Sequence, residues 1–63
     1  MAFYKVFYLG LNGAIFAAED VECVDDDDAV ERARERCSDH FEANGFEVWQ
    51  RDRRVHLEKL STL

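Results

Sequence analysis

The dipeptide Asn12-Gly13 constrains the fold more than any other feature of the sequence. It lies between two segments rich in aromatic and branched residues, 3–11 and 14–24, and such residues favour β-strands. Asn-Gly is typical of a two-residue type I′ hairpin turn, because both central residues of that turn need positive φ angles. The sequence therefore predicts an antiparallel hairpin over residues 3–24, in which Lys5 faces Asp20 across the strands.

Four consecutive aspartates at 25–28 predict the start of a helix. Asp25 has a side chain suited to capping the free N–H groups, and the acids that follow favour the positive end of the helix dipole. Asn44-Gly45 predicts the end of the helix, in a left-handed conformation. Between these points apolar residues recur at the spacing of one helix face: Ala29, Val30, Ala33, Cys37 and Phe41.

The remaining residues predict a second hairpin, with strands at 46–50 and 54–60 joined by the polar turn 51–53. The element order is ββαββ. We expect an α+β fold in which one helix packs on a mainly antiparallel four-stranded sheet. The 63 residues allow one small domain, 1–63, since a chain of this size buries only about 60% of the surface exposed on unfolding.

The alternation of side chains assigns each strand residue to one face of the sheet. The face expected to pack against the helix carries Tyr4, Val6, Tyr8, Ile15, Ala17, Glu19, Val21, Cys23, Phe46, Val48, Val55 and Leu57. The opposite, outer face carries Phe3, Lys5, Phe7, Leu9, Phe16, Ala18, Asp20, Glu22, Glu47, Trp49, Arg54 and His56.

This outer face is too apolar for an ordinary solvent-facing surface, and apolar patches of that kind mark interaction sites. We therefore expect a homodimer interface, or a site for another protein, formed by Phe3, Phe7, Leu9, Phe16 and Trp49. The alternative is that the register slips by one residue or that a bulge mixes the two faces, because a one-residue shift reverses every assignment.

The charge distribution argues against nucleic acid as a partner. The net charge is −6, and residues 1–31 hold one lysine against eight carboxylates. An acidic chain does not accumulate on a phosphate backbone, because that binding depends on clustered Lys and Arg, although a local basic edge remains open to it. No apolar run approaches the length of a membrane span, and no signal peptide is visible at the start, so we expect a cytoplasmic protein with reduced thiols.

The residues that could bind a metal lack the spacing of known sites. Cys23, Cys37, His40 and His56 form a Cys2His2 set by number, but no Cys-x-x-Cys pair is present. The aspartates at 25–28 are consecutive and lack the alternate spacing and central glycine of a calcium loop. We expect no metal and no other cofactor.

No pattern typical of catalysis is present, such as a glycine-rich phosphate loop or a nucleophile elbow, so we expect that the protein is not an enzyme. One basic corner remains, formed by Arg51, Arg53, Arg54 and His56. It provides an alternative function, in which the domain binds a small anionic ligand or a peptide on the outer face.

The chain resembles a group of short bacterial proteins of unknown function, with nearly its whole length covered. The matching residues are Tyr4-x-Val6-x-Tyr8-Leu9, Gly13-x-Ile15, Glu22-Cys23-x-Asp25-Asp26, Ala29, Ala33-Arg34, Glu47-Val48-Trp49 and Arg53-Arg54-Val55. The chain departs from that group in the longer connector at 38–44 and in Phe16, where a polar residue is expected. A weaker likeness, based on the Asp25-x-x-x-Ala29 helix start after a hairpin, is to HicB-type antitoxins. That likeness implies a regulatory domain that binds a small basic toxin.

Overall fold

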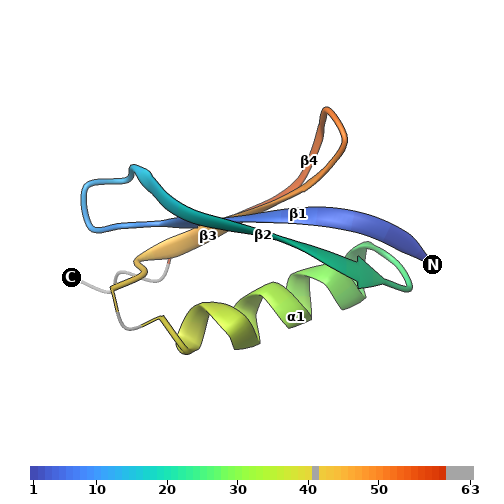
Figure 1. The fold of residues 1–63 in the computed structure, drawn as a ribbon, viewed down its shortest axis with the longest axis horizontal. Coiled ribbons are helices and arrows are strands. Elements are labelled where there is room, and N and C mark those ends of the chain that lie inside the picture. Colours follow the sequence, from blue (N-terminus) through green and yellow to red (C-terminus); the bar gives the residue numbers. More distant parts are fainter. Residues whose placement is uncertain (41, 60–63) are drawn as a thin grey trace.

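The computed structural model describes residues 1–40 and 42–59 of the chain. The elements are β1 (Ala2–Leu9), β2 (Ile15–Cys23), α1 (Asp26–Ser38), β3 (Gly45–Gln50) and β4 (Arg53–Lys59). The strands form one sheet in the order β2-β1-β3-β4, in which all neighbours are antiparallel. The helix lies along one face of this sheet (Figure 1). The predicted α+β fold of ββαββ order is confirmed; Phe41 and Leu60, which were expected at the ends of the helix and of the fourth strand, lie outside the described residues.

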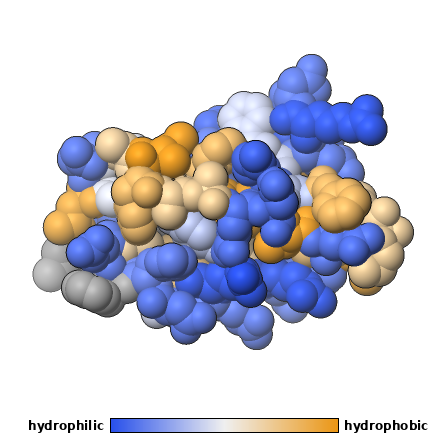
Figure 2. Space-filling view, viewed as in Figure 1, coloured by the Kyte–Doolittle hydropathy of each residue, from blue (hydrophilic) through white to orange (hydrophobic). Residues whose placement is uncertain are grey.

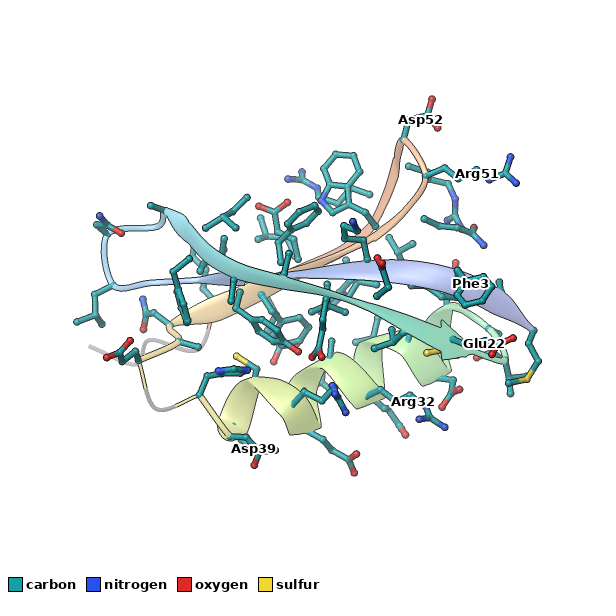
Figure 3. The ribbon with its side chains drawn as sticks, in the orientation of Figure 1. Phe3, Glu22, Arg32, Asp39, Arg51 and Asp52 are labelled. Atoms are coloured by element: carbon teal, nitrogen blue, oxygen red, sulfur yellow. The ribbon has the colours of Figure 1, made fainter. Side chains whose placement is uncertain are left out.

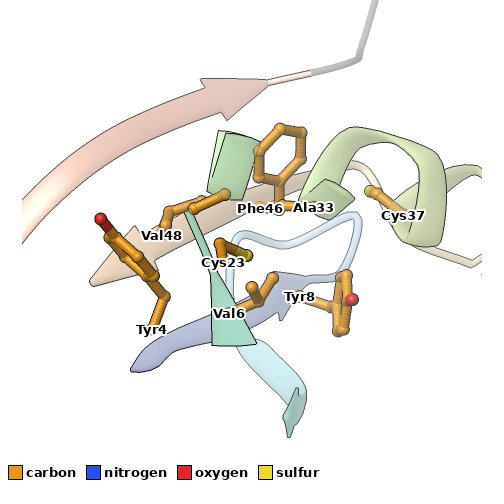
Figure 4. Packing of buried hydrophobic residues seen from close by; sticks show 9 residues of the cluster. Tyr4, Val6, Tyr8, Cys23, Ala33, Cys37, Phe46 and Val48 are labelled. Carbon is orange, nitrogen blue, oxygen red and sulfur yellow. The ribbon is translucent and has the colours of Figure 1, made fainter. Parts of the chain in front are cut away.

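The core lies between the helix and the inner face of the central strands. It consists of Tyr4, Val6 and Tyr8 from β1, Phe46 and Val48 from β3, Cys23 from β2, and Ala29, Ala33 and Cys37 from α1 (Figure 4). The helix contributes only small side chains, so it can lie close to the large residues of the sheet. Its other faces are charged, and the surface below the sheet layer is accordingly polar (Figure 2).

The start of the helix follows the prediction and its end does not. Asp25 is the N-cap residue, and its side chain accepts a hydrogen bond of 2.9 Å from the backbone N–H of Asp28. The helix ends at Ser38, well before the predicted stop, with Asp39 as the C-cap in a right-handed conformation. Gly45 is the first residue of β3 and has no positive φ angle. The prediction that Asn44-Gly45 ends the helix was therefore wrong.

The turn of the first hairpin is wider than predicted. Lys5 does face Asp20, and their side chains form an ion pair of 3.3 Å. Gly13 has a φ angle of 82°, but Asn12 has no positive φ, so the turn is not of type I′. The chain instead turns over residues 10–14, closed by a hydrogen bond of 2.8 Å from the N–H of Gly10 to the carbonyl of Ala14.

Each hairpin contains one irregularity of register. In the first, Tyr8 pairs with Ala17 but Leu9 pairs with Ile15, which leaves Phe16 as an extra residue in β2. In the second, Val48 pairs with His56 but Trp49 pairs with Arg54, which leaves Val55 as an extra residue in β4. The alternative given above, in which a bulge mixes the two faces, is therefore what occurs in one part of each hairpin. Ile15 and Leu57, expected on the helix side, lie on the outer face, and His56, expected outside, lies on the helix side.

Candidate functional site: the outer face of the sheet

The outer face is the side of the sheet that α1 does not cover (Figure 1). Residues paired across neighbouring strands point to the same side, so the register arranges the outer side chains in four rows. From β2 to β4, the first row is Glu22 and Phe3, and the second is Asp20, Lys5, Trp49 and Arg54. The third row is Ala18, Phe7, Glu47 and Leu57, and the fourth is Ile15, Leu9, Gly45 and Lys59.

Several large apolar side chains of this face are in contact with solvent. Phe3 is 71% exposed, Ile15 54% and Leu57 41%. Phe7 and Trp49 are half-buried. Such exposure on one side of a sheet is unusual, because apolar area removed from water contributes about 25 cal/mol per Å² to stability. The outer face therefore offers more unburied apolar surface than the fold requires.

The face is hollowed between its two halves. The β3–β4 hairpin bends away from the helix, so that Arg51 and Asp52 at its tip rise above the sheet, while Phe3 and Glu22 lie at the same end (Figure 3). A groove of about 620 Å³ results, lined by Phe3, Tyr4, Lys5, Phe7, Ile15, Asp20, Glu47, Trp49 and Arg51. The indole Nε1–H of Trp49 donates a hydrogen bond of 2.8 Å to Glu47 Oε1, which fixes the ring at the wall of the groove.

Phe16 does not belong to this face. Its ring lies near the imidazole of His40, with a centroid distance of 6.2 Å, and the same imidazole is 4.6 Å from the ring of Tyr8. The bulge turns the Phe16 side chain toward the helix side, so its placement with Phe3, Phe7, Leu9 and Trp49 was wrong. Alternation along the sequence placed Ile15 and Leu57 on the helix side, whereas the bulges put both on the outer face. These bulges leave no local signal in the sequence.

The predicted basic corner is divided between the two faces. Arg53 points to the helix side, where it donates two hydrogen bonds of 3.2 Å to Asp26. Asp26 also accepts a hydrogen bond of 2.7 Å from the hydroxyl of Tyr4, and this bond raises the pKa of Tyr4 to about 12. Arg53 in turn lowers the pKa of Asp26. This cluster joins the second hairpin to the start of the helix.

His56 is likewise engaged on the helix side. Its Nε2 lies 3.0 Å from Glu58 Oε1, and Arg34 of the helix binds the same carboxylate with its Nε and Nη2. The pKa of Glu58 is lowered to about 2, mainly by the hydrogen bond from Arg34 and next by the one from His56. The four residues proposed as an anion contact are thus not brought together, and only Arg51 and Arg54 remain on the outer side.

A third polar cluster involves Glu19, the one charge expected on the inner face. Its carboxylate accepts hydrogen bonds from the Tyr8 hydroxyl and, at 2.6 and 2.9 Å, from the guanidinium of Arg36. Arg36 lowers the pKa of Glu19, while burial and the bond to Glu19 raise the pKa of Tyr8. The cluster attaches the later part of the helix to β1 and β2, so its role is structural.

The cysteines and histidines are spread over the fold. Cys23 and Cys37 are buried free thiols, and burial raises the pKa of both, so they remain protonated near neutral pH. His40 and His56 lie against Tyr8 and Phe46. Within residues 1–40 and 42–59, no group of three or more His, Cys, Asp or Glu side chains has an arrangement that could hold a metal ion.

In the part of the chain that the structure describes, no helix combines the length and the apolar character needed to cross a membrane. Comparison of the chain with known protein families, with curated proteins and with solved structures found no match.

Proposed function

We propose that the protein is a small, non-catalytic interaction module that forms a homodimer through the outer face of its sheet. The observation that carries the proposal is the exposure of Phe3, Ile15 and Leu57 on the face of the sheet that no other element of residues 1–40 and 42–59 covers. Burial of apolar surface is the dominant favourable term in most protein association. A second copy brings an identical apolar face and buries both at once.

The size of the face supports a dimer of modest affinity. Four strands about 4.8 Å apart and four rows about 6.8 Å apart span roughly 500 Å² in each copy. Two copies would bury roughly 1,000 Å² in total, at the lower end for specific interfaces. We therefore expect a micromolar dissociation constant rather than an obligate dimer.

Sedimentation equilibrium over 1–200 μM, a range chosen around about micromolar affinity, tests this proposal. The wild-type chain should shift from monomer toward dimer within that range. Leu57→Lys should stay monomeric, because a lysine within the contact would lose its hydration. A monomeric wild type at the highest concentration would refute self-association.

Phe16→Lys is the matched control. Phe16 is 44% exposed and Leu57 is 41% exposed, but Phe16 lies on the helix side of the sheet. Both variants change the net charge equally and remove an apolar side chain of similar exposure. If Phe16→Lys also abolished the dimer while its circular dichroism remained unchanged, the outer face would not be the interface.

We also place the protein in the cytoplasm. Both cysteines, Cys23 and Cys37, are free and buried in the core. Unpaired thiols are typical of proteins in reducing compartments.

A further inference from the structure

The outer face carries opposite charges at its two edges. At the β2 edge, Asp20 and Glu22 occupy adjacent outward positions, and both are exposed. Across the sheet, Arg54 ends the second row on β4, and Arg51 rises from the β3–β4 turn. The apolar groove lies between the acidic edge and the basic edge. Asp52 at the tip reduces the positive charge there but does not cancel that of the two arginines.

These charges are largely unused within the monomer. Among the described residues, no ion pair includes Glu22, Arg51 or Arg54, and the single pair of Asp20 is with Lys5. Asp20 and Lys5 retain 68% and 50% side-chain exposure in that pair. An exposed pair of this kind contributes little to stability, so these groups are available to a partner.

We infer that the two copies of the proposed dimer pack face to face about a two-fold axis parallel to the strands. This inference rests on the proposed function. A rotation of 180° about such an axis lays β2 of one copy over β4 of the other, with each row facing the same row of the second copy. Asp20 then faces Arg54 of the second copy, and Glu22 lies near its Arg51. The symmetry repeats both contacts, so that four ion pairs surround the apolar centre.

The other simple face-to-face arrangement has its axis perpendicular to the strands. It lays each strand over its own copy in the reverse direction, so that the second row faces the third. Arg54 would then face Leu57, and Trp49 would face Glu47 of the other copy. Lys5 and Glu47 face an aromatic ring in both arrangements, so they do not distinguish the two axes. The difference lies in Arg54, which faces the carboxylate of Asp20 only when the axis runs along the strands, and a charge that loses hydration without such a partner weakens the contact.

The shape of the monomer agrees with the axis along the strands. The tip of the β3–β4 hairpin rises out of the sheet on its outer side (Figure 3). In the inferred dimer each raised tip reaches toward the Glu22 end of β2 in the other copy, which brings Arg51 near that carboxylate. Two sheets packed in this way also keep their strands within about 30° of each other, as in aligned β-sandwiches.

Charge reversal tests the inferred axis. The acidic edge is reversed in Asp20→Arg/Glu22→Arg, and the basic edge in Arg51→Glu/Arg54→Glu. Each variant alone places like charges together at all four contacts of the dimer, so its dissociation constant should rise by about tenfold or more. In an equimolar mixture both contacts become attractive again, and the heterodimer should form with nearly wild-type affinity. Native mass spectrometry with one variant labelled with ¹⁵N measures the heterodimer directly.

The control separates this contact from the general attraction between chains of different net charge. Glu31→Arg/Glu35→Arg makes the same change in net charge, but both residues lie exposed on the helix, away from the outer face. Mixed with Arg51→Glu/Arg54→Glu, it should form far less heterodimer. If Arg51→Glu/Arg54→Glu formed as much heterodimer with this control as with Asp20→Arg/Glu22→Arg, the inferred axis would be wrong. The homodimer would then have another geometry. A monomeric wild type would overturn the proposed function and this inference together.

Discussion

Gly45→Ala tests whether Gly45 is required for close packing of two strands rather than for backbone conformation. An added Cβ would lie 2.5 Å from the carbonyl oxygen of Glu58 and 3.2 Å from the Cα of Lys59. Both neighbours belong to the backbone of β4, which pairs with β3 at this point. They cannot move away as a flexible side chain would.

The expected loss of stability follows from that distance. Carbon–oxygen contacts between strands are normally about 3.3–3.6 Å, so the strands must separate by roughly 0.8 Å or more. Overpacking of this kind costs about 1–3 kcal/mol, and a weakened hydrogen bond of the β3–β4 ladder adds about 1 kcal/mol. The lower entropy of unfolded alanine offsets about 0.4–1 kcal/mol. With the middle of each range, we expect a net loss of about 2 kcal/mol.

Thermal and urea unfolding followed by far-ultraviolet circular dichroism measure this loss. A domain of this length has a stability of about 3–9 kcal/mol, so Gly45→Ala should lower the melting temperature by at least about 10 °C. Gly10→Ala is the matched control, because its Cβ would have no neighbour closer than 3.6 Å and its φ angle is not positive. Equal melting temperatures for the two variants would refute the close approach of β3 and β4 at Gly45.

Two further predictions concern the acid pH range and the second hairpin turn. Because Arg34 and His56 lower the folded-state pKa of Glu58 from 4.5 to about 2, its contribution to stability is present above pH 4.5 and is lost as the pH falls toward 2. Glu58→Gln should therefore reduce the loss of stability between pH 5 and about 2 in urea titrations; an unchanged slope would contradict this assignment. Arg51 has a φ angle of 57°, in the left-handed region that favours glycine, so Arg51→Gly should raise the free energy of unfolding by about 0.5 kcal/mol. Asp52→Gly, at a neighbouring position without a positive φ, should lower the free energy of unfolding by about 0.5–1 kcal/mol. If both variants changed the free energy of unfolding in the same direction, the turn conformation in solution would differ from the one described.

Local features of the sequence were predicted well because their causes are local. The N-cap at Asp25 depends on one side chain and on an N–H three residues later. The pairing of Lys5 with Asp20 follows from a hairpin that closes between two strand-forming segments. The inner positions of Phe46 and Val48 follow from alternation within a short, regular strand.

The role of Gly45 shows where local interpretation fails. Asn-Gly after a helical pattern is typical of a left-handed helix end, but the helix ends at Ser38. Gly45 is needed because the backbone carbonyl of Glu58, thirteen residues later in the chain, leaves no room for a Cβ at this position. No local pattern records such a contact between two strands.

The sequence by itself determined the order of the elements, the start of the helix and the apolar character of both sheet faces. Only the tertiary structure decided which residues form the outer face, because the bulges at Phe16 and Val55 reverse the alternation in part of each hairpin. Their positions are defined by the pairing of β2 with β1 and of β4 with β3. Alternation is a property of one strand, whereas a bulge is a property of the pair of strands in which it occurs.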